Sequence, residues 1–158
     1  MASLSAHIDE LKQLLALLDH PFTVIGITET KIREGIDPIT NVNIPGYEFK
    51  QTATKSCFGG AGIYIKEGFD PVIRTDLSQS IENVSESIFV ELKRESRKNL
   101  IIGCIYRHHS SVSYFLDQYF NDTLRLLQKE KNKISALMGD FNIDLLKVDC
   151  NFYDLLSS

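Results

Sequence analysis

Short apolar runs with the length of strands alternate with two segments of helical periodicity, and this alternation most constrains the fold. Apolar residues recur at intervals of three and four over residues 4–18 and again over residues 115–127, which predicts two amphipathic helices. Strands are predicted over residues 22–27, 47–51, 63–66, 87–93, 100–106 and 134–138. This order is typical of one α/β unit whose helices pack outside its sheets.

The size of the chain is that of one domain. Its 158 residues are 43% hydrophobic, which is enough to bury a core without disulfides or metal, so we expect residues 1–158 to form a single domain. The three cysteines, Cys57, Cys104 and Cys150, are odd in number and lack metal-ligand spacing, so we expect reduced thiols.

Neither a membrane nor a general basic surface is indicated. No apolar run approaches the roughly 20 residues of a membrane span, and the first residues lack the basic then apolar order of a signal peptide. We therefore expect an intracellular protein with no membrane partner. The net charge of −4 argues against a surface that holds nucleic acid by charge alone. Lysines and arginines near residues 93–98 and 129–133 are expected to lie in solvated turns.

Two predicted strands end in acidic residues. Glu29 follows the first strand in ITETK, and Asp140 and Asn142 follow the last strand in GDFNID. Burying carboxylates without partners is costly, and ligand sites of α/β folds gather beyond the carboxyl ends of strands, so the two ends are candidates for one cleft. Taken alone, Glu29 is better interpreted as a solvated acid or a helix cap than as part of a site.

GDFNID also begins like a calcium-binding EF-hand loop, in which acidic or amide residues alternate. Asp140, Asn142 and Asp144 satisfy this opening. Leu145 stands where the loop needs glycine, and Asn151 stands where it needs a bidentate glutamate. We therefore set the calcium loop aside, and Asp144 is expected to be a surface acid or helix cap.

Seven stretches carry a resemblance to a known family: SLSAHIDELKQLL, VIGITETKI, IPGYEF, GGAGIYIK, ESIFVEL, IIGCIYRHHSS and ALMGDFNIDLL. In this order they resemble the endonuclease/exonuclease/phosphatase (DNase I-like) superfamily, and most closely the endonuclease domains of non-LTR (LINE-type) retrotransposons. ETK, YR and GDFN together make the resemblance fairly specific. It implies an α/β (α+β) fold, a four-layer α/β/β/α sandwich, and an enzyme that nicks DNA by hydrolysing a phosphodiester.

The resemblance also implies residue roles. Glu29 resembles the ligand of Mg²⁺, for which Mn²⁺ may substitute. Asp140 resembles the residue that orients or deprotonates the attacking water, Asn142 the amide that holds a phosphate oxygen, and Tyr106 the tyrosine whose hydroxyl contacts the scissile phosphate. Without the family, Tyr106 is equally well interpreted as a core aromatic at a strand end.

Further roles implied by the resemblance concern the substrate. Arg107, His108 and His109 are candidate contacts to DNA, whose phosphate backbone is the expected partner, and a DNA substrate implies a nuclear location. Gly59 and Gly60 are expected to meet backbone requirements of a turn rather than to cradle phosphate.

The sequence also departs from the family. Counterparts of an asparagine on the first strand, of a late catalytic aspartate and of a closing Ser-Asp-His are missing, so we expect a domain truncated at both ends, with one sheet largely missing. Such groups act as a unit, so the expected activity is weak or absent. Two alternatives stay open: a non-catalytic remnant or interaction module that associates through an uncovered sheet, and a phosphatase or phosphodiesterase acting on a small phosphoester.

Overall fold

The computed structural model describes residues 4–33, 35–36, 42–54, 58–109 and 112–143. The helical segments are α1 (Leu4–Ala16), α2 (Val112–Tyr114), the π-helical η2 (Phe115–Phe120) and α3 (Asn121–Lys129). The strands are β1 (Val24–Thr28), β2 (Tyr47–Thr52), β3 (Ala61–Lys66), β4 (Pro71–Ile73), β5 (Ser80–Ile81), β6 (Ser85–Leu92), β7 (Leu100–Arg107) and β8 (Ile134–Asp140). None of the helices described here is long and apolar enough to cross a membrane.

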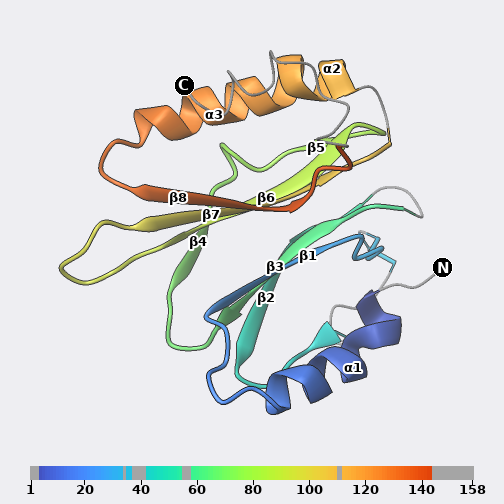
Figure 1. Ribbon diagram of the computed structural model, residues 1–158, viewed down its shortest axis with the longest axis vertical. Coiled ribbons are helices and arrows are strands. Elements are labelled where there is room, and N and C mark those ends of the chain that lie inside the picture. The colour runs from blue at the N-terminus through green and yellow to red at the C-terminus, as the bar shows by residue number, and fades with distance from the viewer. Residues whose placement is uncertain (1–3, 34, 37–41, 55–57, 110–111, 144–158) are drawn as a thin grey trace.

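These elements form four layers (Figure 1). One sheet has the order β1-β3-β2, and the other has the order β4-β6-β7-β8 with β5 paired to β6. Helix α1 covers the outer face of the smaller sheet, and α2, η2 and α3 cover the outer face of the larger sheet. The α/β/β/α sandwich is therefore confirmed. We expected one sheet to be largely missing, but three strands of the smaller sheet are in place within the described residues.

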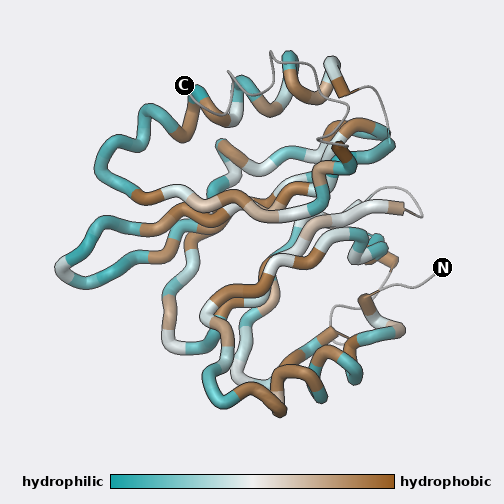
Figure 2. The backbone as a smooth tube through the Cα atoms, viewed as in Figure 1, coloured by the Kyte–Doolittle hydropathy of each residue, from teal (hydrophilic) through white to brown (hydrophobic). Residues whose placement is uncertain are grey.

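The layers are held together by side chains that alternate between the two faces of the central strands, as a strand period of two requires. Figure 2 shows the apolar backbone segments concentrated where the layers meet. Between the sheets, Ile63 and Ile65 of β3 pack with Ile88 and Val90 of β6. On the other face of β6, Phe89 packs towards the helical layer.

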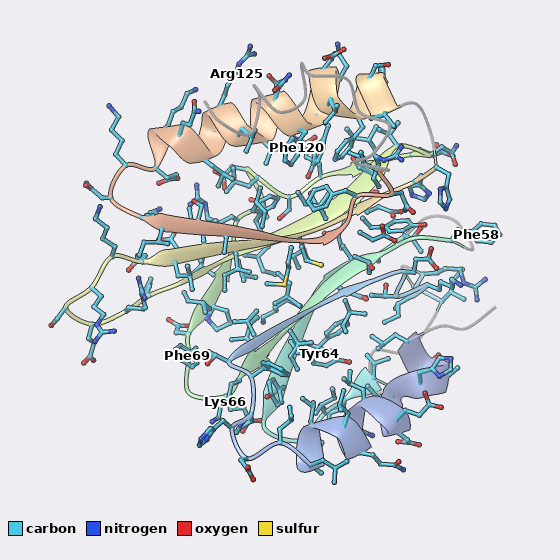
Figure 3. All side chains as sticks on the ribbon, viewed as in Figure 1. Phe58, Tyr64, Lys66, Phe69, Phe120 and Arg125 are labelled. Carbon is cyan, nitrogen blue, oxygen red and sulfur yellow. The ribbon has the colours of Figure 1, made fainter. Side chains whose placement is uncertain are left out.

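Each outer helix is anchored by a buried aromatic residue. Figure 3 shows Tyr64 between the smaller sheet and α1, where it packs with Leu4 and Ile8. Phe120 lies on the inner side of the helical layer and packs on the larger sheet. The π-helical turn before α3 places Tyr119 and Phe120, neighbours in sequence, in the same core. The sequence prediction of one regular helix over residues 115–127 missed this turn.

Strand β8 differs from the prediction of a buried strand. Among the residues that the structure describes, it pairs only with β7, in parallel, and forms the edge of the larger sheet. Leu137 and Met138 are partly buried, whereas Ile134 is 48% exposed. The apolar run correctly indicated a strand. The sequence alone does not show whether that strand lies inside a sheet or at its edge, where it is more exposed.

Cys104 is a packing residue, as expected. Its side chain is fully buried between the sheets, and burial raises the pKa of its thiol to about 12. The thiol therefore stays protonated and unreactive at neutral pH. Cys57 and Cys150 lie outside the described residues.

An ion-pair network joins the turn before β8 to β6 and to the segment after β4. Glu91 of β6 lies 2.9 Å from the Arg74 guanidinium and 2.7 Å from Lys133 Nζ, and it accepts a 2.7 Å hydrogen bond from Asn99. Glu130 lies 2.5 Å from Arg74 and 3.0 Å from Lys133. Lys133 lies in the turn before β8, as expected, but its side chain is not simply solvated, because it pairs with the distant Glu91 and with Glu130, three positions earlier.

This network makes stability depend on acid pH. Burial raises the pKa of Glu91, but hydrogen bonds from Lys133, Asn99 and Arg74 outweigh burial and leave the pKa lowered in the folded protein. The stabilisation is therefore fully present above the unfolded pKa, near pH 4.5, and is lost as the pH falls through the folded value. We expect Glu91→Gln to lower the free energy of unfolding at pH 7 by roughly 1.5–3 kcal/mol.

Thermal unfolding between pH 7 and pH 3 tests this prediction. Glu91→Gln should lose less stability than the wild type as the pH falls, because the variant has already lost the titrating group. Asp122→Asn is the control, since Asp122 forms an exposed pair with Arg125 on one helix. Parallel pH curves for wild type and Glu91→Gln would contradict the prediction.

Candidate active site

The ends of three strands bring the predicted residues together. Strands β7 and β8 run parallel, and their register pairs Tyr106 with Asp140 at their carboxyl ends. Strand β1 of the other sheet lies across β7 and β8, and Glu29 follows its last residue. The cleft predicted from two acidic strand ends is therefore a meeting point of both sheets at one end of the sandwich.

A hydrogen bond connects the two sheets at this point. The Tyr106 hydroxyl donates to Glu29 Oε1 at 2.8 Å, and Tyr106 is only 4% exposed. Burial raises the pKa of Tyr106 well above its usual range, and the nearby carboxylates of Glu29, Asp140 and Glu86 raise it further. The hydroxyl therefore keeps its proton at neutral pH and acts as a hydrogen-bond donor.

Glu29 is held in an uncommon backbone conformation. Its φ is 53°, and that of Lys31 is 55°, both in the left-handed region that non-glycine residues rarely adopt. The N–H groups of Thr30 and Lys31 donate to the carbonyls of Gly60 and Gly59 at 3.3 and 2.9 Å, which ties this loop to the turn before β3. The Glu29 side chain is 45% exposed, and its Oε2 lies 3.6 Å from Lys31 Nζ.

The GDFN segment forms a tight turn whose spacing has a structural reason. Gly139 has a φ of 137°, and a Cβ there would lie 1.9 Å from the Ile105 carbonyl oxygen of β7, so only glycine fits. Asp140 Oδ1 then accepts the N–H of Asn142 at 2.9 Å. Asn142 has a φ of 48°, and its Nδ2 donates to the Arg107 carbonyl at 2.6 Å.

Arg107 lies beneath this turn. It is 2% exposed, and its guanidinium donates to the main-chain carbonyls of Phe141 and Asn142. Burial lowers the pKa of Arg107, and the charge of Asp140 partly offsets this effect. We expected a substrate contact from Arg107, whereas the structure places its charged group against the GDFN turn.

His108 packs beside Tyr106, with the ring centroids 5.0 Å apart and the rings edge to face. Its Nε2 lies 3.0 Å from Oε2 of Glu86, a carboxylate that is only 4% exposed. The sequence analysis did not identify Glu86. Like Glu29, Glu86 is an acidic residue at one end of an apolar strand, and this pattern could have indicated it. His109 is exposed next to this group, and Asp144 lies outside the described residues.

The donor set suits a hard cation. Within the described ranges, no group of three or more histidine, cysteine, aspartate or glutamate residues is arranged to hold a metal. Mg²⁺ does not need such a group, because it binds through one or two carboxylates together with water and substrate phosphate. The partly exposed carboxylate of Glu29 and the exposed Asp140 fit this second mode.

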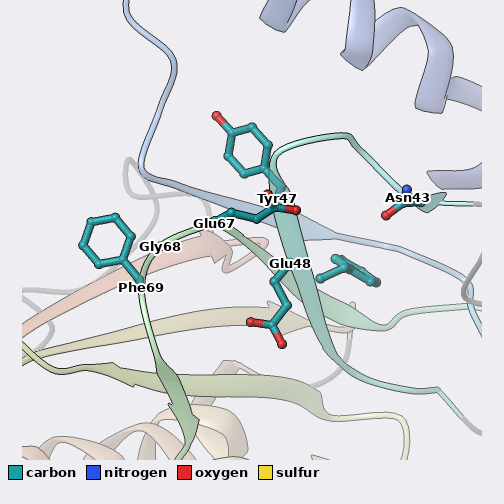
Figure 4. A pocket seen from close by; sticks show the side chains of 7 residues that line it. Asn43, Tyr47, Glu48, Glu67, Gly68 and Phe69 are labelled. Carbon is teal, nitrogen blue, oxygen red and sulfur yellow. The ribbon is translucent and has the colours of Figure 1, made fainter.

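A pocket of about 390 Å³ lies elsewhere (Figure 4). Its lining residues are Asn43, Tyr47, Glu48, Phe49, Glu67, Gly68 and Phe69. In the antiparallel smaller sheet, Tyr47 pairs with Lys66 at one end, whereas Thr28 pairs with Ala61 at the other. The pocket therefore lies at the end of the sheet opposite Glu29 and is separate from the candidate active site.

Comparison with solved structures places this geometry in a known fold. A humanized TDP2 from D. rerio with 14 mutations has a TM-score of 0.59 and 16% identity, over 96% of this chain and 63% of its own. An endonuclease/exonuclease/phosphatase family protein from Bacteroides thetaiotaomicron gives 0.57 and 16%, over 90% and 56%. The 3′ phosphatase NExo from Neisseria, bound to a product DNA hairpin, gives 0.57 and 16%, over 94% and 57%.

The chain has the endonuclease/exonuclease/phosphatase fold. It spans about 56–63% of the length of these similar structures. No family model matches the sequence, and no curated protein matches it. In this fold the candidate active site combines an acidic strand end from each sheet with a tyrosine hydroxyl between them.

The close approach of Gly139 to β7 gives a stability prediction. We expect Gly139→Ala to destabilise the protein by more than the roughly 1–3 kcal/mol typical of backbone strain alone, because the added methyl group also collides with the Ile105 carbonyl. Gly68→Ala is the matched control, since Gly68 also has a positive φ, of 96°, but open space around its Cβ position. Urea unfolding of both variants measures the difference, and equal losses would contradict the prediction.

Proposed function

We propose that this chain is a metal-dependent phosphodiesterase that hydrolyses the phosphate backbone of DNA. The observation that carries the proposal is the 2.8 Å hydrogen bond from the Tyr106 hydroxyl to Glu29, with Asp140 in register beside Tyr106. A neutral donor and two carboxylates at adjoining strand ends are the groups that in-line hydrolysis of a phosphodiester requires.

Each of the three residues has a separate role in this proposal. Glu29 would hold Mg²⁺ or Mn²⁺, which when bound supplies Lewis-acid stabilisation of charge on the phosphate. Asp140 orients the attacking water and accepts its proton. The Tyr106 hydroxyl donates its single proton to Glu29 in this structure, and we assign it to turn to an oxygen of the scissile phosphate when substrate binds, where negative charge increases during the reaction.

Asn142 and Arg107 take neighbouring roles. The Asn142 amide has two N–H donors; one binds the Arg107 carbonyl, and we assign the other to a phosphate oxygen. Because the Arg107 guanidinium is bound to the turn carbonyls, we assign Arg107 to holding Asp140 and Asn142 in place rather than to substrate. His108 and His109 keep the proposed role of substrate contacts at the rim.

The nature of the substrate is part of the proposal. The NExo structure of this fold is bound to a product DNA hairpin, and a D. rerio TDP2 structure is complexed with a single-strand DNA product. These likenesses support a DNA substrate. The finer proposal of a DNA-nicking endonuclease of the retrotransposon type, and with it a nuclear location, rests on the ETK, YR and GDFN motifs. The negative net charge means that binding should rely on contacts within the site.

Nicking of supercoiled plasmid by the purified chain tests the proposal. We expect a nicking rate that is weak, in line with the sequence analysis, requires Mg²⁺ or Mn²⁺, is abolished by EDTA, and falls roughly 10²-fold to 10⁴-fold in Asp140→Ala, which lacks the proton acceptor. Asp122→Ala, an exposed acid on α3, is the matched control and should nick like the wild type.

Two outcomes would contradict the proposal. Nicking equal to that of Asp140→Ala would mean that the chain does not use this site for catalysis on DNA. Hydrolysis of bis(p-nitrophenyl) phosphate without nicking of plasmid would instead support the alternative of a phosphodiesterase for small phosphoesters.

Tyr106→Phe separates the hydroxyl from the ring. We expect the variant to fold normally, because the ring packs between the strands, and to nick roughly 10²-fold more slowly, as when one donor to a developing oxyanion is removed. Initial nicking rates, with circular dichroism as the check on folding, measure this effect. An unchanged rate would remove Tyr106 from the mechanism and leave it as a core aromatic.

A further inference from the structure

We propose that Glu86 is a positioning residue that fixes both Glu29 and Tyr106, one on each sheet, through a single buried carboxylate. The inference rests on the proposed function, because it concerns the same site. Glu86 is the second residue of β6, is 4% exposed, and pairs in register with Tyr106 on β7. The sequence analysis did not assign Glu86 to the site.

The link to Glu29 runs through the turn before β3. Glu86 Oε2 accepts the N–H of Gly60 at 2.9 Å. The carbonyls of Gly59 and Gly60 in turn accept the N–H groups of Lys31 and Thr30, the two residues that follow Glu29. The carboxylate on the larger sheet therefore holds the turn of the smaller sheet that keeps Glu29 in its left-handed conformation.

The two glycines of this turn are explained by the close approach of Glu86 to Gly59 and of Thr30 to Gly60. Gly59 and Gly60 have φ values of 90° and 92°. A Cβ on Gly59 would lie 2.2 Å from Glu86 Oε2, and a Cβ on Gly60 would lie 2.2 Å from Thr30 Oγ1. The turn thus leaves room for a carboxylate on one side and for the Glu29 loop on the other.

The link to Tyr106 runs through His108. The same Oε2 atom lies 3.0 Å from His108 Nε2, and the His108 ring packs edge to face on Tyr106. The His108 main-chain N–H donates to the Val84 carbonyl at 2.9 Å, which fixes the backbone next to β6. Glu86 therefore holds an imidazole against the ring whose hydroxyl donates to Glu29.

Burying a carboxylate is costly unless hydrogen bonds compensate it. Glu86 has such bonds from Gly60 and His108, and both partners adjoin the site. Glu91, on the same strand, lies in the ion-pair network with Arg74 and Lys133 at the other end. The two glutamates share residue type, strand and burial but differ in their partners, so Glu91 is the matched control.

Amide hydrogen exchange of the whole chain, measured by NMR without metal, tests the proposal directly. We expect Glu86→Ala to increase exchange of the Thr30 and Lys31 amides about tenfold relative to the amides of the β6–β7 ladder, because the turn that accepts their hydrogen bonds loses its anchor. Glu86→Gln should restore most of the protection, since its carbonyl oxygen can accept the Gly60 N–H. Glu91→Ala should leave the ratio unchanged.

Titration with Mn²⁺, followed by paramagnetic relaxation, adds a functional measurement. We expect Glu86→Ala to weaken Mn²⁺ binding by about 10-fold to 100-fold, the usual effect of removing a group that orients a ligand. Glu91→Ala should bind like the wild type even though it is less stable, which separates positioning from general stability.

Exchange that rises equally over the whole chain in Glu86→Ala, or Mn²⁺ affinity equal to the wild type, would overturn the inference. Failure of the proposed function has a different signature. A wild-type chain that does not nick plasmid overturns the proposed function, whereas the exchange of Thr30 and Lys31 in Glu86→Ala decides the role of Glu86 in either case.

Discussion

The parallel pairing of β8 with β7 is the constraint on which the candidate site depends. Two parallel strands end at the same edge of a sheet, so Tyr106 and Asp140 become neighbours. The next pair of residues, Arg107 and Phe141, are likewise in contact although they lie 34 positions apart in the chain. The pairing in turn depends on Gly139, whose missing side chain lets β8 approach the Ile105 carbonyl. The helical layer between the two strands in the chain covers the outer face of the sheet.

From the smaller sheet, the candidate site includes Glu29, whose backbone conformation is unfavourable. Glu29 and Asn142 both adopt left-handed backbone conformations, which are unfavourable for residues with a side chain. Hydrogen bonds to other segments hold both. The N–H groups of the two residues after Glu29 donate to the carbonyls of Gly59 and Gly60, and the Arg107 guanidinium donates to the Asn142 carbonyl. Strain that is compensated in this way is typical of functional sites, because it fixes side chains before a ligand arrives.

The sequence predicted the layers and the acidic strand ends, because both depend on local patterns. Apolar periodicity identified both outer helices and six of the strands, and the acids of ETK and GDFN marked the two ends that meet. The edge position of β8, the ion pair of Lys133 with Glu91 and the inward position of Arg107 were not predictable, because each depends on contacts between residues distant in the chain. The short strands β4 and β5 were missed for a simpler reason, since three and two residues carry no period.

The two buried glutamates of β6 show why residue type alone does not define a site. Glu91 has Arg74 and Lys133 as partners, so its charge is neutralised by side chains that fasten the edge strand. Glu86 has a main-chain N–H and an imidazole as partners, and both belong to segments that carry the candidate catalytic groups. The two carboxylates therefore meet the cost of burial in different ways, Glu91 mainly through charged side chains and Glu86 through polar groups whose positions it fixes. In our proposal the end of β6 that holds Glu86 therefore belongs to the candidate active site, although none of its atoms needs to touch a substrate.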